Sequence, residues 1–135
     1  MNYRGYGKST GSPSQSSLFS DALFIFDHIS DTYSIPSTNI ILMGRSLGSA
    51  VATYVAKQRH VRAVILITPF DSLVNIAKEH YPFFPVKLLL RHPFDSVQIA
   101  PEITSPMIAI IAEQDRIISN EHSANLVEHW GMKSH

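Results

Sequence analysis

At 135 residues the chain is long enough for one domain and too short for two. A hydrophobic fraction of 44% against a charged fraction of 16% allows a buried core and excludes a disordered chain. Eleven basic residues balance eleven acidic ones, so we expect neither a nucleic acid nor an anionic membrane as a partner. There is no cysteine, which excludes disulfides and thiolate metal sites.

The beginning of the chain predicts a loop rather than a targeting segment. Residues 1–10, MNYRGYGKST, are polar and glycine-rich and lack the apolar stretch of a secretion signal. The apolar runs elsewhere are far shorter than the roughly 20 residues that span a membrane. We therefore expect a cytoplasmic protein without a membrane span.

The first regular elements are a helix and a strand. Leu18, Ala22, Ile25 and Ile29 recur at helical spacing, and Ser16 or Ser17 can cap the helix that they predict. The short apolar run NIILMG, residues 39–44, predicts a strand. The alanine-rich stretch LGSAVATYVAKQ, residues 47–58, then predicts a second helix.

Two further apolar runs predict buried strands, RAVILITPF at 62–70 and PMIAIIAEQD at 106–115. Between them lies a proline-rich excursion, residues 71–105, for which we expect a lid-like arrangement. The stretch 119–130 predicts a closing helix that ends at Gly131. This order is typical of an α/β fold, with a mostly parallel sheet covered by helices on both faces.

The turn between the first strand and the second helix carries the motif G-x-S-x-G, as Gly44-Arg45-Ser46-Leu47-Gly48. A serine at such a sharp turn adopts a strained backbone, and the residues two positions away must be small for the chain to pass. The hydroxyl is then exposed at the carboxyl end of a strand, and the next N–H can face a developing oxyanion. The alternative is an ordinary glycine-containing turn with a solvated serine.

A nucleophilic serine needs a base, and the base needs a carboxylate that orients it. Asp115 comes just past the strand PMIAIIAEQ, residues 106–114, and is the preferred candidate for this acid. Asp71 occupies the equivalent place one strand earlier and is the second candidate. A loop aspartate that caps the following turn is the alternative for either residue.

These motifs together resemble the α/β-hydrolase superfamily, in particular its Bem46-like and ABHD13- and ABHD17-like serine hydrolases. The similarity rests on NYRGYGKSTGSPS, GRSLG, TPFDSL, HPFDS and SPMIAIIAEQDRIIS, in that order along the chain. It implies that Ser46 is the nucleophile, Asp115 the acid and Leu47 an oxyanion donor. It further implies hydrolysis of esters, thioesters or amides through an acyl-enzyme, without metal or cofactor. Ala112 and Ser49 are mild departures, because the family usually has glycine at both positions.

The resemblance also identifies what this chain lacks, namely the catalytic histidine and the upstream oxyanion loop of the family. His122 and His129 lie seven residues apart on one helix face, where packing or surface roles are expected. His135 ends the chain, where a base cannot be held in position. We therefore expect residues 1–135 to form a single partial α/β-hydrolase domain, impaired or inactive by itself.

Three functional interpretations remain open at this point. The first is a serine hydrolase represented by a partial chain, acting on a small-molecule or acyl substrate. The second is a catalytically dead remnant or binding module that keeps the 44–48 turn. The third is complementation by another chain, because the strand at 39–44 would be an uncovered sheet edge that can self-associate. Apolar residues of the excursion fit either an acyl pocket or a buried core: Phe83, Phe84, Val86, Leu88, Leu89 and Leu90.

Overall fold

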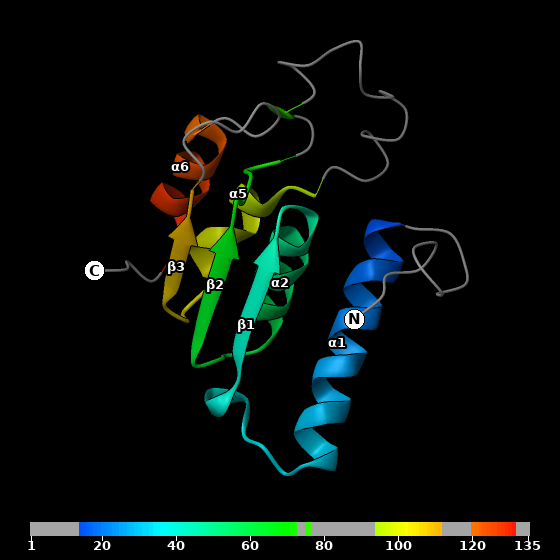
Figure 1. Ribbon diagram of the computed structural model, residues 1–135. Coiled ribbons are helices and arrows are strands. Elements are labelled where there is room, and N and C mark those ends of the chain that lie inside the picture. Colours follow the sequence, from blue (N-terminus) through cyan, green and yellow to red (C-terminus); the bar gives the residue numbers. More distant parts are fainter. Residues whose placement is uncertain (1–13, 73–74, 77–93, 112–119, 132–135) are drawn as a thin grey trace.

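The computed structural model describes residues 14–72, 75–76, 94–111 and 120–131 (Figure 1). The elements in chain order are α1 (Gln15–Thr32), the 3-10 turn η1 (Ser37–Asn39), β1 (Ile41–Arg45), α2 (Leu47–Gln58), β2 (Ala63–Ile67), α5 (Ser96–Ile99), the 3-10 turn η2 (Ala100–Glu102), β3 (Met107–Ile110) and α6 (Asn120–His129). None of the helices in these ranges combines the length and the apolar character that crossing a bilayer requires.

Helix α1 begins earlier than its apolar pattern indicates, because Ser14 rather than Ser16 or Ser17 is its cap. The Ser14 hydroxyl accepts a hydrogen bond from the Ser17 N–H at 3.0 Å, and the Ser17 hydroxyl accepts one from the Ser14 N–H at 3.2 Å. This reciprocal pair satisfies two N–H groups that a helix terminus leaves without partners. The prediction of the cap was wrong, although Ser17 takes part from inside the first turn.

The three strands form a parallel sheet in the order β1-β2-β3, which confirms the predicted α/β class. Helix α2 covers one face of β1 and β2, and α1 packs against α2 (Figure 1). On the covered face, Val64 and Leu66 are fully buried. Strand β1 lies at the end of the described sheet, with β2 on one side of it.

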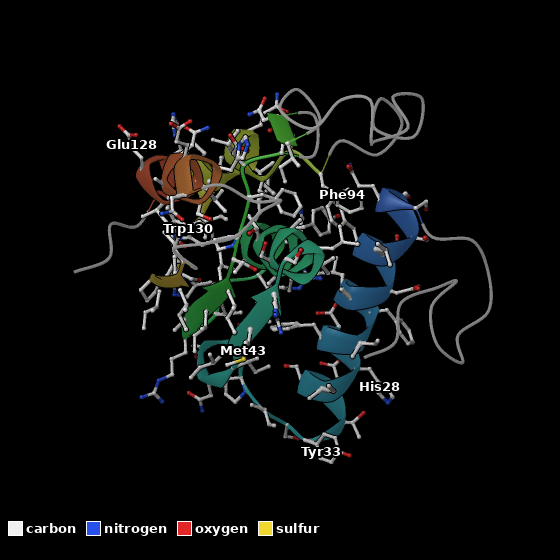
Figure 2. All side chains as sticks on the ribbon, turned by 45° about the horizontal axis from the view of Figure 1, so that its top comes forward. His28, Tyr33, Met43, Phe94, Glu128 and Trp130 are labelled. Carbon is white, nitrogen blue, oxygen red and sulfur yellow. The ribbon has the colours of Figure 1, made fainter. Side chains whose placement is uncertain are left out.

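The opposite face of the described sheet is open, although helices were expected on both faces. Met43 is 65% exposed and Ile108 is 57% exposed, and the register places both beside Ile65 of β2. Figure 2 shows Met43 projecting from β1 on the side away from α2. In the described part of the chain, then, the helices cover one face and leave an apolar row on the other.

Candidate active site

The turn at Ser46 has the backbone geometry that the motif predicts. Strand β1 ends at Arg45 and α2 begins at Leu47, so Ser46 is the single residue between them. Its φ of 52° and ψ of −116° lie where a residue with a side chain is rarely found. Such a conformation costs about 1–3 kcal/mol and persists only where the surroundings hold it. Ser46 is exposed, which places its hydroxyl at the surface.

Backbone hydrogen bonds on both sides hold this strained residue. The Ser46 N–H donates to the Ile67 carbonyl at 3.0 Å, which ties the turn to the end of β2. The Ser46 carbonyl accepts from the Ser49 N–H at 2.9 Å and from the Ser49 hydroxyl at 2.5 Å. Ser49 is itself buried, so the turn is anchored in the core while the Ser46 side chain stays outside.

The first glycine of the motif, Gly44, is required by the close approach of two backbone segments. A Cβ atom on Gly44 would lie 2.2 Å from the carbonyl oxygen of Gly48 and 2.8 Å from the N atom of Ser49. Both distances are far inside van der Waals contact, and both partners are backbone atoms of α2. The steric reason for glycine at position 44 is thereby confirmed.

The first turn of α2 supplies the candidate oxyanion donor. Leu47 is the first residue of α2 and is half-buried. The N–H groups of a helix's first turn lack intrahelical acceptors and carry the positive end of the helix dipole. The Leu47 N–H is therefore the kind of group that stabilises negative charge developing beside Ser46.

The preferred acid, Asp115, lies outside the described residues, as do His135 and the apolar residues 83–90 of the excursion. Strand β3 is shorter than the apolar run that predicted it, since it ends at Ile110. Asp115 therefore stays a prediction from sequence, placed between the end of β3 and the beginning of α6.

The second candidate acid, Asp71, is described, and it is a buried hydrogen-bonding centre with 3% of its surface exposed. Its Oδ1 accepts from the Ser72 N–H at 2.8 Å and from His122 Nδ1 at 3.0 Å. Its Oδ2 accepts from Asn75 Nδ2 at 2.8 Å and from Asn125 Nδ2 at 2.9 Å. Four donors from two segments of the chain thus converge on one carboxylate.

The hydrogen bonds also decide the ionisation of Asp71. Burial by itself raises the pKa of this carboxyl, but the donors of Asn125, Asn75 and Ser72 and the neighbouring His122 together hold its pKa below the ordinary value. The carboxylate is therefore ionised at neutral pH. An ionised Asp71 is what allows all four donors to be accepted at once.

The histidines take the packing and surface roles expected of them. His122 is 6% exposed and donates to Asp71, and His129 is exposed with its Nδ1 2.7 Å from the Asn125 carbonyl oxygen. In the described ranges, no histidine is hydrogen-bonded to the Ser46 hydroxyl. Those ranges also contain no group of three histidine, aspartate or glutamate side chains placed to hold a metal ion.

The sequence did not predict the hydrogen-bonded cluster around Asp71. Its two donors from α6, His122 and Asn125, lie 51 and 54 residues after Asp71 in the sequence, so no local pattern joins them to it. One signal is present in the sequence: His122 and Asn125 are spaced i, i+3 and therefore lie on one face of α6.

Comparison with known proteins bears on the family and the fold of the chain. A family model described as serine hydrolase matches residues 26–135. The chain is 34% identical over 127 residues to the uncharacterized protein Rv2307c of Mycobacterium tuberculosis. That alignment covers 94% of this chain and 45% of Rv2307c. It is 33% identical over 137 residues to the alpha/beta hydrolase domain-containing protein WAV2 of Arabidopsis thaliana. That alignment covers 90% of this chain and 44% of WAV2.

Among solved structures, an alpha-beta hydrolase from Vibrio vulnificus is similar to the chain. The superposed region covers 99% of this chain and 53% of that hydrolase. The TM-score of that match is 0.78 and the sequence identity 21%, so the likeness concerns the fold. The chain spans less than half the length of the curated relatives that it matches.

Proposed function

The chain belongs to the serine hydrolase family of the α/β-hydrolase superfamily, and on that premise we propose that Ser46 is the nucleophile of a hydrolase acting on ester, thioester or amide bonds. The observation that carries the proposal is the strained backbone of Ser46 between β1 and α2. Strain of this kind concentrates at functional sites, because an ordinary turn residue gains nothing from it. The substrate class is an acyl compound small enough to reach a serine at the sheet edge.

In the proposed reaction, the Ser46 hydroxyl oxygen attacks the carbonyl carbon of the substrate while its proton passes to a base. The resulting oxyanion lies against the Leu47 N–H at the beginning of α2. Collapse of this intermediate expels the leaving group and leaves an acyl-enzyme, which water then cleaves. Asp115 has the role of orienting the base, by the family resemblance.

The reaction also needs a base, and no histidine of the described ranges is hydrogen-bonded to Ser46. His122 is bonded to Asp71 and His129 contacts its own helix, so neither is committed to Ser46. We therefore propose that the isolated chain is impaired or inactive, because no histidine of the described ranges is hydrogen-bonded to the Ser46 hydroxyl and loss of any member of a serine triad removes most of its rate enhancement. This observation also favours the second candidate function, a hydrolase remnant or binding module.

The open sheet face and the β1 edge support a proposal about assembly. Met43, Ile108 and Ile110 are each more than half exposed, and β1 pairs with β2 alone in the described sheet. Exposed apolar strands at an edge tend to pair with other chains. We propose that the isolated chain self-associates through this side of the sheet.

Ester hydrolysis measured on the purified chain tests the catalytic proposal. p-Nitrophenyl acetate and a longer p-nitrophenyl ester serve as substrates, with Ser46→Ala as the test variant. Ser20→Ala is the matched control, since Ser20 is exposed on α1 and its hydroxyl bonds to the Ser16 carbonyl of the same helix. Turnover that Ser46→Ala abolishes and Ser20→Ala retains supports an active hydrolase. Turnover that is measurable and equal in wild type and Ser46→Ala would contradict a nucleophilic Ser46, whereas absence of turnover in both is the result expected if the isolated chain is inactive.

A further inference from the structure

We propose that the cavity between α1, α2 and α5 binds an organic ammonium group carried on a small apolar body, with Asp95 as its counter-ion. The cavity has a volume of about 230 Å³. Sites for drug-sized ligands measure roughly 300–1,000 Å³, so the fitting ligand is smaller than these. In the described ranges the lining comes from α1, α2 and residues 94–99, and Ser46 is not part of it. The proposal therefore does not depend on the hydrolase function.

Aromatic side chains line this cavity. Phe19 of α1 and Tyr54 of α2 stack on each other, with ring centroids 4.2 Å apart and an interplanar angle of 10°. Phe94 meets Phe19 edge-on, with centroids 5.7 Å apart and an angle of 86°. Figure 2 shows Phe94 beside the beginning of α1. Aromatic rings pack against apolar groups and attract a cation that lies over their faces. This lining therefore suits both parts of an organic ammonium.

The backbone at Phe94 fixes the place from which Asp95 leaves. Phe94 has a φ of 45°, where a bulky residue is rarely found. Its N–H donates to Gln15 Oε1 at 2.8 Å, and only 5% of the residue is exposed. Strain of this kind persists where the surroundings hold it, and it is typical of functional sites. Asp95 therefore follows a residue that is anchored to α1 through both its backbone and its ring.

Asp95 supplies a carboxylate that the described structure leaves incompletely satisfied. It occupies the N-cap position of α5, where an aspartate usually accepts a helix N–H, but its side chain makes no capping bond. Its Oδ1 is buried and has no hydrogen-bond partner in the part of the chain that the structure describes. A buried carboxylate oxygen without a donor is destabilising. Asp95 as a whole is half-buried and lines the cavity, and the χ2 torsion of an aspartate is broad, so the carboxylate can turn towards a donor there.

The charges around the cavity favour a cation over an anion. Lys57 also lines the cavity, and its Nζ lies 3.2 Å from Glu102 Oε2. This ion pair neutralises Lys57, whereas Asp95 has no ion pair within the described ranges. The charge left in the described lining is therefore negative. An ionised carboxylate accepts hydrogen bonds and donates none, so the best ligand carries an N–H, which a quaternary ammonium lacks.

Binding of benzylamine, which is protonated at neutral pH, tests the inference. Saturation-transfer NMR and isothermal titration calorimetry of the full chain at low salt measure it. Benzyl alcohol lacks the charge, and benzyltrimethylammonium keeps the charge but lacks the N–H. We expect benzylamine to bind about tenfold or more tightly than either analogue, since hydrogen bonds between ionised groups are the strong ones. Equal binding of either analogue, or no saturable binding of benzylamine at millimolar concentrations, would overturn the inference.

Two matched variants locate the binding at Asp95. Asp95→Asn removes the charge at nearly constant shape and should raise the Kd of benzylamine about tenfold or more. Asp31→Asn makes the same change at an exposed position of α1 outside the cavity lining, and it should leave the Kd unchanged. The same Kd in both variants would overturn the role of Asp95.

A second pair of variants decides the matter if Asp95→Asn does not fold, as judged by circular dichroism. Gln98 is exposed and lines the cavity, so a change of its charge leaves the core untouched. Gln98→Glu should lower the Kd of benzylamine and Gln98→Lys should raise it, each about twofold or more at low salt. Unchanged Kd values, or changes in the same direction, would overturn the inference.

The ammonium group can come from a free amine or from the lysine side chain of another protein. N-Acetyl-lysine methylamide, titrated beside benzylamine, distinguishes these sources. Tighter binding of the blocked lysine assigns the cavity to a lysine side chain, and tighter binding of benzylamine assigns it to a free amine. Both results support an ammonium site, provided that Asp95→Asn weakens the tighter ligand. An affinity for the tighter ligand that Asp95→Asn leaves unchanged would overturn it.

Discussion

Replacement of Gly44 by alanine is the sharpest test of the packing that shapes the Ser46 turn. The added Cβ would lie 2.2, 2.5 and 2.8 Å from the Gly48 carbonyl oxygen, the Gly48 carbonyl carbon and the Ser49 N atom. No rotamer change relieves these contacts, because all three are backbone atoms. Strand β1 and the beginning of α2 must therefore move apart.

The expected size of the effect follows from the cost of overpacking. Inserted methyl groups in packed regions typically cost about 1–3 kcal/mol, and a clash with rigid backbone belongs at the upper end, about 3 kcal/mol. For a chain of this length, that corresponds to a decrease of about 10 °C in Tm. Since small domains are stable by about 5–15 kcal/mol, the variant should fold at low temperature but lose much of its margin.

Thermal and urea unfolding followed by circular dichroism measure this prediction. We expect a lower urea midpoint with an unchanged m-value, which identifies a change in stability rather than in compactness. Ser20→Ala, an exposed substitution on α1 that also ends in alanine, is the control and should change stability by less than about 0.5 kcal/mol. A Gly44→Ala variant as stable as Ser20→Ala would refute the steric account of the turn.

Three further predictions concern α1, Asp71 and the open sheet face. Ser14→Ala removes the cap of α1 and should lower the free energy of unfolding by about 1 kcal/mol in urea titrations; no change would contradict the reciprocal pair with Ser17. The pKa of Asp71 is lower in the folded state than in the unfolded chain, so its ionised carboxylate stabilises the folded state. This contribution to the free energy of unfolding is fully present above the pKa of an unfolded aspartate and is lost as the pH falls through the folded-state pKa. Urea midpoints of wild type and Asp71→Asn should therefore differ at pH 7 and converge in strong acid, and a gap that persists below both pKa values would contradict this. Met43→Lys, on the open face, should reduce self-association in sedimentation velocity without changing the fold, and an unchanged sedimentation coefficient in a self-associating sample would contradict the proposed surface.

The sequence predicted those features that local chemistry determines. The motif around Ser46 encodes strand, turn and helix within a few residues, and the structure confirms all three. Helix α1 was also predicted, but its cap was not, because Ser14, Ser16 and Ser17 are all competent caps. The choice of Ser14 depends on the reciprocal bond with Ser17, which helical periodicity does not reveal.

Contacts between distant parts of the chain could not be predicted in this way. The donors to Asp71 from α6 lie more than 50 residues away in sequence, and the arrangement of the sheet brings them together. The apolar run of β3 likewise predicted a buried strand, and helices were expected on both faces of the sheet. In the described structure, Met43 and Ile108 are exposed on one face, because what covers a strand depends on neighbours and not on the strand's own composition.

Fluorophosphonate labelling of the folded chain, with the modified residue located by peptide mass spectrometry, tests the central claim most directly. The probe reacts with a serine that its surroundings activate, so Ser46→Ala and a heat-unfolded sample are the controls. The account predicts that any adduct forms on Ser46, only in folded protein, and at a rate that a supplied base increases. Labelling of other serines to the same extent, or of Ser46 equally in the unfolded chain, would contradict the claim that this turn is built to present a nucleophile.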